Sequence, residues 1–313
     1  MEGLVNSSLC GSTKCAVLVA LSFLVTFPGA ASGQTLLRWK LKVGESFGVV
    51  IEQETESLVA FSAKSAATKI DVKVSLGWLV TAADESGFSI KQSIERIVMD
   101  LATPQGPAIH FDSALRIRPV GQVRELAEAL QPLVGAEFEI KLSPRGEVLK
   151  AEPLNEAAKG LFAANEKGGE AGEAPRATVE KLLRQSLVVL PEKAVTAGES
   201  WTTSSELAIA AGPQTQETVY TLEKMGQVDG KSQAEISMVS KLSPRAGDSS
   251  AKTGSPRLKI KTHQQQGKIL FAVEEGRVVN AEQTQELETE REYQNTKITV
   301  KLKSTQRTTV EAR

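Results

Sequence analysis

The chain has few of the residues that most often carry recognisable chemistry. Its 313 residues include two cysteines and two histidines, and aromatic residues make up only 4%. So few aromatic rings leave little surface for stacking against sugars or nucleic-acid bases. The 37 Lys and Arg residues nearly balance the 38 Asp and Glu residues, so no overall field favours nucleic acid or an anionic membrane. We therefore expect no nucleic-acid partner.

Long apolar runs are also scarce, and the exception lies near the N-terminus. Lys14 is followed by an apolar run of about 13 residues that ends at Phe27. This length is typical of a signal peptide and falls short of the roughly 20 residues that cross a bilayer. We predict that residues 1–33 are a signal peptide cleaved before Gln34, and that the product is periplasmic or secreted, with no stable membrane span. The alternative is a buried N-terminal helix.

Cysteine is expected to be missing from that product. Cys10 and Cys15 both precede the predicted cleavage site. Neither follows the apolar run, where a lipid-accepting cysteine would lie, so a lipoprotein is not expected. The mature chain would then form no disulfide, carry no thiolate nucleophile and bind no metal through sulfur.

An alternation with period two predicts strands in the first part of the chain. In residues 67–80 the apolar positions are Ile70, Val72, Val74 and Leu76. In the next run the side chains expected on one face are Phe88, Ile90, Gln92, Ile94, Arg96 and Val98. Asp84–Gly87 separates the two runs and is typical of a hairpin turn. We expect antiparallel strands with one solvated face.

Helical patterns cluster in the middle. Apolar residues recur at helical spacing from Val123 to Val134, and Gly135 suits a helix end. We expect helical character to continue through residues 151–165. A Gly/Glu-rich flexible linker is expected at residues 166–174, and another helix over residues 178–190.

Strand patterns return in the second part. Residues 218–242 predict a hairpin that turns near Asp229-Gly230, and residues 243–257 predict a polar loop. Residues 263–282 and 295–306 predict further strands. In the last strand we expect Ile298, Val300 and Leu302 to face inward, and Lys297, Thr299, Lys301 and Lys303 to face water. Such lysines could bind phosphate, but on an exposed strand face or edge they more often aid solubility and block edge pairing.

Two short patterns occur twice, in the same order. Gly-Glu-Ser-aromatic is found at residues 44–47 and 198–201, and a turn with Gly-charged-Val is found within residues 143–152 and 273–282. The ordered pair predicts a duplicated β-rich unit. We interpret the first pattern as architecture: glycine permits a tight turn, the glutamate is solvated, the serine satisfies a free backbone group, and the aromatic ring enters the core. A catalytic role would need a base beside the serine, and no His or Lys is placed by spacing to supply one.

Together these patterns predict an α+β fold that is predominantly antiparallel β. We expect two related β-rich halves, at residues 34–152 and 190–313, with a helical and Gly/Glu-rich connector at residues 153–189. The first half would end in a helix and a hairpin. The alternative is one continuous curved sheet, or an open half-barrel, wrapped on helices.

One block of the sequence is similar to a known family. Leu190-Pro191, the run VTAGESW at residues 195–201, and FAVEEGRVVNAE at residues 271–282 resemble the exported bacterial family catalogued as domain of unknown function 6263. The resemblance covers nearly all of the expected mature chain. It implies a signal peptide, an early strand after a Gly-acid-polar-aromatic turn and a central helical stretch. It implies no catalytic residues.

No catalytic, cofactor-binding or metal-binding residue is predicted. The sequence has no Gly-x-Ser-x-Gly elbow, no phosphate-binding P-loop and no dinucleotide fingerprint. His110 and His263 lie in different halves, so a metal site with a carboxylate would need the fold to bring them together. Glu274-Glu275 could do glycosidase chemistry, but at a turn we expect them to be solvated. We expect the tryptophans to anchor the core; they are Trp39, Trp78 and Trp201.

Three hypotheses for function remain. The first is a non-catalytic binding or carrier protein of the cell envelope, whose long strands form a groove for an apolar ligand. The second is an unrecognised hydrolase that uses carboxylates or His110. The third is a structural or partner-binding envelope protein, for which exposed apolar strand edges would argue. A deep, mostly aliphatic cavity without perturbed titrating groups would favour the first hypothesis, and a pocket with two carboxyl groups at glycosidase spacing would favour the second.

Overall fold

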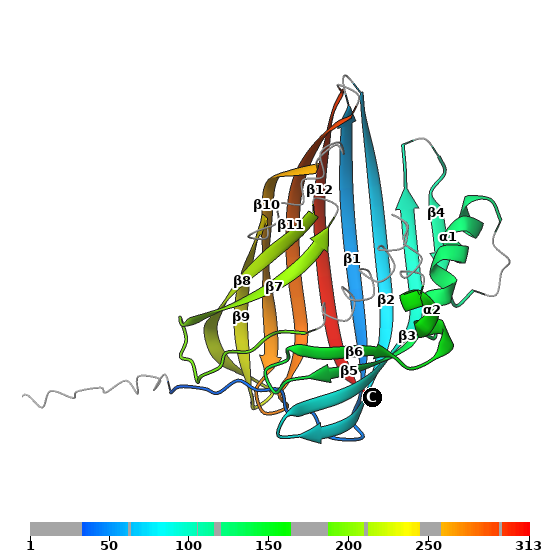
Figure 1. Ribbon diagram of the computed structural model, residues 1–313. Helices are drawn as coiled ribbons and strands as arrows, with labels where there is room; N and C mark the ends of the chain where they lie inside the picture. The colour runs from blue at the N-terminus through cyan, green and yellow to red at the C-terminus, as the bar shows by residue number, and fades with distance from the viewer. Residues whose placement is uncertain are drawn as a thin grey trace, which may run out of the picture. The chain divides into compact units, whose positions relative to one another are not determined.

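The fold is dominated by long antiparallel strands that share one sheet (Figure 1). The structure is a computed structural model that describes residues 33–61, 64–104, 106–115, 120–163, 187–209, 212–244, 258–293 and 296–313. Its strands are β1 Ser46–Phe61, β2 Lys64–Asp84, β3 Gly87–Ala102, β4 Ile109–Asp112, β5 Glu137–Leu142, β6 Val148–Pro153, β7 Ser200–Ile209, β8 Gly212–Val228, β9 Lys231–Pro244, β10 Leu258–Ala272, β11 Arg277–Tyr293 and β12 Thr296–Ala312.

The order of strands in the sheet is β6-β5-β3-β2-β1-β12-β11-β10-β9-β8-β7, and β4 pairs with β3. The prediction of a predominantly antiparallel β fold is therefore confirmed. The β-rich parts on either side of residues 153–189 are joined in one continuous sheet through the pairing of β1 with β12. The hairpins predicted at Asp84–Gly87 and Asp229-Gly230 are both present, and Asp229 and Gly230 have the positive φ angles that such a turn needs.

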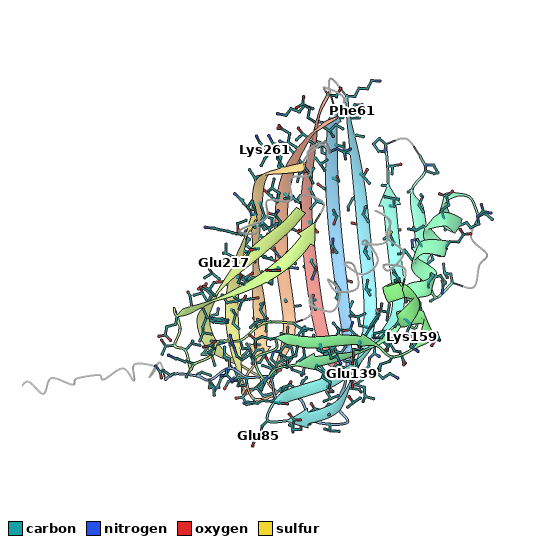
Figure 2. The ribbon with its side chains drawn as sticks, in the orientation of Figure 1. Phe61, Glu85, Glu139, Lys159, Glu217 and Lys261 are labelled. Carbon is teal, nitrogen blue, oxygen red and sulfur yellow. The ribbon has the colours of Figure 1, made fainter. Side chains whose placement is uncertain are left out.

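The sheet has a buried face at one end, and this face defines the geometry of the molecule. On β1 the buried side chains are Phe47, Val49 and Ile51, and in the paired register they lie beside Trp78, Leu76 and Val74 of β2. We call the face that carries these side chains the inner face, and we call the end of the sheet where they lie the base. Figure 2 shows Glu85 in a turn at the base and Phe61 at the far end. Trp39 and Trp78 are buried, as expected, whereas Trp201 is only partly buried.

One strand departs from the predicted alternation. A β-bulge in the β2–β3 pairing places Ser75 opposite Arg96 and Leu76 opposite Ile94, so Glu95 is an extra residue. A single extra residue reverses the side-chain pattern that follows it. Ile97 is therefore buried, and Arg96 is exposed on the outer face. The prediction that Arg96 and Val98 share a face with Ile94 was wrong for this reason.

The base is closed by two segments that lie outside the sheet. Residues 35–41 run along the base, where Leu37, Trp39 and Leu41 are buried. The backbone N–H of Trp39 donates to the carbonyl of Pro144 (3.0 Å), and that of Lys40 donates to the carbonyl of Gly276 (3.0 Å). This segment therefore contacts the turn of the β5–β6 hairpin and the turn of the β10–β11 hairpin.

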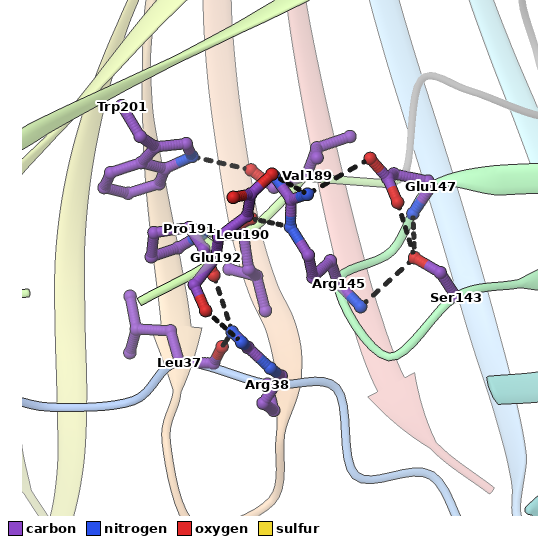
Figure 3. Close-up of polar contacts among 10 residues, drawn as sticks. All are labelled: Leu37, Arg38, Ser143, Arg145, Glu147, Val189, Leu190, Pro191, Glu192 and Trp201. Atoms are coloured by element: carbon purple, nitrogen blue, oxygen red, sulfur yellow. Dashed lines mark hydrogen bonds and ion pairs between the residues drawn. The ribbon is translucent and has the colours of Figure 1, made fainter. Parts of the chain in front are cut away.

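The second segment, residues 188–192, which we call the strap, links the two edges of the sheet (Figure 3). Arg145, in the β5–β6 turn, donates from Nε to the carbonyl of Leu190 (2.8 Å), and Trp201 of β7 donates from Nε1 to the carbonyl of Val189 (2.8 Å). Arg38 donates to the carbonyls of Pro191 and Glu192 (2.6 Å each). Burial, followed by the nearby charge of Arg145, lowers the pKa of Arg38.

The helices cover less of the chain than predicted. α1 spans Gln122–Leu130 and continues as a 3₁₀ turn, and Gly135 follows with φ 81°, as expected of a helix end. α2 spans Glu156–Ala163, but residues 151–153 belong to β6, so helical character does not begin at residue 151. Residues 187–190 are not helical, because their backbone bonds to the hairpin turn and to Trp201. The predicted signal peptide with Cys10 and Cys15, the linker and most of the helix at residues 178–190 lie outside the described residues.

The two Gly-Glu-Ser-aromatic turns have matching geometry. Gly44 and Gly198 have φ angles of 88° and 89°. Their N–H groups donate to the carbonyls of Val80 and Leu222, which return N–H bonds to the glutamate carbonyls. Each glutamate side chain also accepts a backbone N–H, at 2.8 Å for Glu45 from Lys42 and 2.6 Å for Glu199 from Thr196. The expectation that the serine would satisfy a free backbone group is confirmed for Ser46, whose hydroxyl donates to the carbonyl of Arg313 (3.2 Å), whereas the Ser200 hydroxyl lies 2.8 Å from that of Thr221.

The outer face of the central strands is charged, with signs that alternate from strand to strand. β11 presents Glu286, Glu288 and Glu290, and β12 presents Lys303, Lys301 and Lys297, which pair with these glutamates at 3.6, 3.5 and 2.5 Å. The lysine row thus faces water as predicted. It lies in the middle of the sheet, however, so these lysines pair with glutamates and do not protect an edge.

Candidate functional site

The candidate catalytic histidine, His110, lies on the surface. Its Nδ1 atom is 2.7 Å from Oδ1 of Asp100, and the two side chains are 56% and 57% exposed. The nearby Asp112 accepts hydrogen bonds from the guanidinium of Arg96 and from the N–H of Ala114. The Arg96 bond, more than that of Ala114, lowers the pKa of Asp112 to about 2. The His110–Asp100 pair is solvated and does not exclude water from a reacting group, and Asp112, whose side chain is 8% exposed, is already bonded to Arg96 and Ala114.

The second histidine, His263, lies in another part of the molecule, on the inner face of β10. Gln285 of β11 is its neighbour, with 3.1 Å between the two Nε2 atoms. The two histidines belong to β4 and β10, which are not neighbours in the sheet. Among the residues that the structure describes, no group of three His, Cys, Asp or Glu side chains could hold a metal ion.

The carboxylate pair Glu274-Glu275 is tied into the turn before β11. Glu275 bonds Lys231 at 2.6 Å and Arg277 at 2.5 Å. The pKa of Glu275 is lowered chiefly by Lys231, and that of Glu274 chiefly by a hydrogen bond from Ser232. Two carboxyl groups with lowered pKa values do not provide the protonated acid that glycosidase chemistry requires.

A groove of about 800 Å³ lies at the far end of the sheet. By their position in the strand alternation, most of its side chains belong to the outer face. Its charged residues are balanced, and they are Glu56, Glu286, Glu288, Lys69, Lys301 and Lys303. Leu58, Ala67, Ala102, Leu287 and Leu302 supply apolar surface between them. Because its cations and anions are equal in number, this groove favours neither sign of charge.

The inner face carries an unusual row of polar side chains just beyond the core. In the paired register one row crosses seven neighbouring strands, and its members are Thr203, Thr218, Ser240, Gln265, Gln285, Ser304 and Thr55. The next row toward the base adds Gln283, Gln306 and Gln53. We call these ten residues the polar belt. None of them carries a charge.

Hydrogen bonds connect the polar belt across the strands. Thr218 and Ser240 hydroxyls are 2.7 Å apart, and Thr55 and Ser304 hydroxyls are 3.1 Å apart. Gln265 donates from Nε2 to Oε1 of Gln283 at 3.0 Å. Because buried amides and hydroxyls need partners, such a network fixes the side chains in place and gives the surface a defined pattern of donors and acceptors.

Beside and beyond the polar belt, toward the far end, the inner face carries more apolar side chains, with the hydroxyl residues Ser57, Thr68 and Thr289 among them. Seven of these apolar side chains are partly exposed, and they are Val59, Ile70, Leu101, Leu287, Ile298, Val300 and Leu302. They lie on the inner face of five neighbouring strands, from β3 to β11. We call this set the aliphatic band. Partly exposed apolar side chains on adjacent strands form a surface that can bind apolar molecules.

The polar belt was missed at the level of sequence, although a signal exists. Ser304, Gln306 and Thr308 alternate with charged or polar residues along β12, and Gln283 and Gln285 do so along β11. An uncharged polar side chain at every second position of a strand whose other side is charged indicates an inner surface that is not a simple core.

Comparisons with solved structures give likeness of fold only. Lipovitellin, in a structure concerned with lipid–protein interactions, matches with a TM-score of 0.51 and 8% identity, over 87% of this chain and 25% of that one. The chain thus spans about a quarter of the lipovitellin chain. An outer membrane channel from Pseudomonas putida F1 has a TM-score of 0.24, with 9% identity over 87% of this chain and 97% of the channel. DynF of the dynemicin biosynthesis pathway of Micromonospora chersina has a TM-score of 0.18, with 7% identity over 87% and 85% of the chains. Scores this low carry no argument.

Three further observations bear on classification. No curated protein matches the sequence. Within the described residues, none of the helices has the length and apolar character needed to cross a membrane.

A scan against protein families matches residues 85–312 to a family of unknown function, DUF6263. This match spans well over half of the chain and includes both the Gly-Glu-Ser-Trp turn and the Gly-charged-Val turns, so the chain belongs to the DUF6263 family.

Proposed function

We propose that this protein is a non-catalytic binding or carrier protein that holds an apolar ligand on its inner face. The aliphatic band carries the proposal, because its partly exposed side chains lie together beyond a core that is already complete. The likeness of fold to lipovitellin, in a structure concerned with lipid–protein interactions, supports the same class of ligand. The histidine and carboxylate pairs that a hydrolase would use are solvated and bound to cations or to backbone.

The proposed setting is the periplasm or the exterior of the cell. The apolar run that ends at Phe27 supports export, as does the location of both cysteines before Gln34. A carrier in an aqueous compartment also needs a solvated exterior, and the paired charges of β11 and β12 supply one.

We further propose that the sheet arose by duplication of one β-rich unit. The order β6-β5-β3-β2-β1 in one part of the sheet corresponds to β11-β10-β9-β8-β7 in the other, with β12 between them. The matching turns at Gly44 and Gly198 support this, as do bulges directly after Val80 and Leu222, the residues that bond to those turns. Phe47 pairs with Trp78 just as Trp201 pairs with Tyr220.

Ligand binding can be tested with a matched pair of variants. Val300→Gln alters the aliphatic band, whereas Val239→Gln alters a valine on the outer face of β9 that is 50% exposed, and neither residue lines the groove at the far end. We expect an apolar fluorescent probe such as N-phenyl-1-naphthylamine to bind the wild type and Val239→Gln alike, and to bind Val300→Gln several-fold more weakly. Organic extracts of the purified protein, examined by mass spectrometry, should contain an apolar compound. Equal probe binding by both variants would contradict the proposal.

A further inference from the structure

The polar belt and the aliphatic band meet at His263, and this boundary constrains the ligand more closely than apolar surface alone. His263 is opposite Leu287 in the paired register, and Leu287 is opposite Leu302. Its ring bonds Gln285, a member of the belt. A molecule that covers this boundary would therefore contact amides, hydroxyls and an imidazole at one end, and aliphatic side chains at the other.

The hydrogen bonding of His263 leaves one donor without a partner. An amide nitrogen can only donate, so Gln285 Nε2 donates to Nε2 of the ring, which must then accept. The proton of a neutral imidazole then lies on Nδ1, and this atom is buried without a hydrogen-bond partner. Burial also lowers the pKa of His263, which keeps the ring neutral near pH 7. A buried N–H that lacks an acceptor costs free energy, and a ligand that supplies an acceptor would regain it once the ring or its neighbours move to admit the acceptor.

We propose that the ligand is an amphiphile with an uncharged head group that offers a hydrogen-bond acceptor, such as an ester carbonyl or a hydroxyl. This inference rests on the proposed carrier function. The head group lies on the polar belt beside His263, and the alkyl chain lies along Leu287, Leu302 and Val300. A charged head group would lose its hydration against a belt that contains no counter-charge.

The opposite orientation would need a different residue. Arg291 lies on the inner face at the far end, opposite Ile298 in the paired register. An anionic head group that bound such a cation of the far end would place its alkyl chain toward the polar belt, where the chain would cover amides that it cannot satisfy. In this orientation the protein would prefer a fatty acid to an uncharged amphiphile, and Arg291→Gln would remove that preference.

The two orientations of the ligand can be distinguished by measuring which amphiphiles displace N-phenyl-1-naphthylamine from the protein. We expect a monoacylglycerol to displace the probe at a concentration about tenfold lower than a fatty acid or an alkyltrimethylammonium salt of equal chain length. His263→Leu should weaken monoacylglycerol binding by about tenfold relative to binding of the probe by the same variant, with circular dichroism verifying the fold. His110→Leu, at an exposed site on β4, should have no effect and serves as the control.

Other outcomes would contradict one proposal or both. If the fatty acid binds best and Arg291→Gln abolishes that preference, the head-group inference is wrong and the carrier function stands. If His263→Leu and His110→Leu bind the monoacylglycerol equally, the role of His263 is also wrong. If neither the probe nor any amphiphile binds, and sedimentation shows a dimer, the aliphatic band is covered by a second copy and both proposals fail.

Discussion

Single glycines show most clearly how tightly the base is assembled. Gly146 and Gly198 have nearly the same backbone conformation, with φ angles of 88° and 89°. A Cβ atom at Gly198 would meet nothing, whereas one at Gly146 would overlap the indole of Trp39 and the carbonyl of Val188. Two sites with equal backbone strain therefore differ only in how closely another segment approaches.

We expect alanine to lower the free energy of unfolding by different amounts at these two glycines. Gly198→Ala should cost about 1 kcal/mol, because only the positive φ angle is disfavoured. Gly146→Ala should cost about 3 kcal/mol or more, because the indole and the strap must also move. Urea unfolding of the two variants measures the difference. Equal costs would show that the Trp39 contact adjusts freely.

Asp112 illustrates how one ion pair links stability to pH. Its pKa is lowered to about 2, first by the hydrogen bond from Arg96, whereas an unfolded Asp titrates near 3.9. Because the folded pKa is the lower one, the stabilisation is complete above about pH 4 and is lost as pH falls from about 4 toward 2. We expect the melting temperature of Asp112→Asn to fall less steeply than that of the wild type across this range. In an Arg96→Gln background the same substitution should have a smaller effect; additive effects would refute the coupling.

At the scale of elements, the two Gly-Glu-Ser-aromatic turns start strands in the same way but lead to different surroundings. Phe47 is buried in the core at 4% exposure, beneath the guanidinium of Arg277. Trp201 is partly exposed, stacks on Tyr220 with 5.5 Å between ring centroids, and bonds the strap. The sequence pattern predicted the turn correctly, but not the burial of its aromatic residue, because β7 is an edge strand and β1 is central.

This contrast predicts unequal effects of truncation. Phe47→Ala should cost about 3–5 kcal/mol, as is usual for a buried aromatic side chain. Trp201→Ala should cost about 2 kcal/mol, mainly from the stacking and the hydrogen bond to Val189. Trp201→Phe keeps a ring and loses only the hydrogen bond and some volume, so it should lie between Trp201→Ala and the wild type. Denaturant titration tests the order, and a Trp201→Ala cost as large as that of Phe47→Ala would contradict it.

At the scale of the whole molecule, local sequence patterns predicted the positions of strands and turns, but they did not predict the order of the strands in the sheet. Period-two alternation located β2, β3 and β12, and glycine placed the turns at Gly146, Gly230 and Gly276. The sheet order depends on pairings between distant residues, which no local pattern encodes. The same is true of the polar belt, whose members come from seven strands and become a surface only when the register aligns them.

The pairing of β1 with β12 has a further consequence, for how the protein folds. Ser46 accepts a hydrogen bond from the backbone of Arg313, a residue 267 positions later in the sequence, so the centre of the sheet joins the earliest and latest of the described strands. During synthesis β1 and β11 would each keep an unpaired edge until β12 emerges, and such edges are prone to aggregate. Closing so long a loop makes folding slow. A chain of this topology gains from being kept unfolded by chaperones until its last strand is available, and so is suited to export before folding.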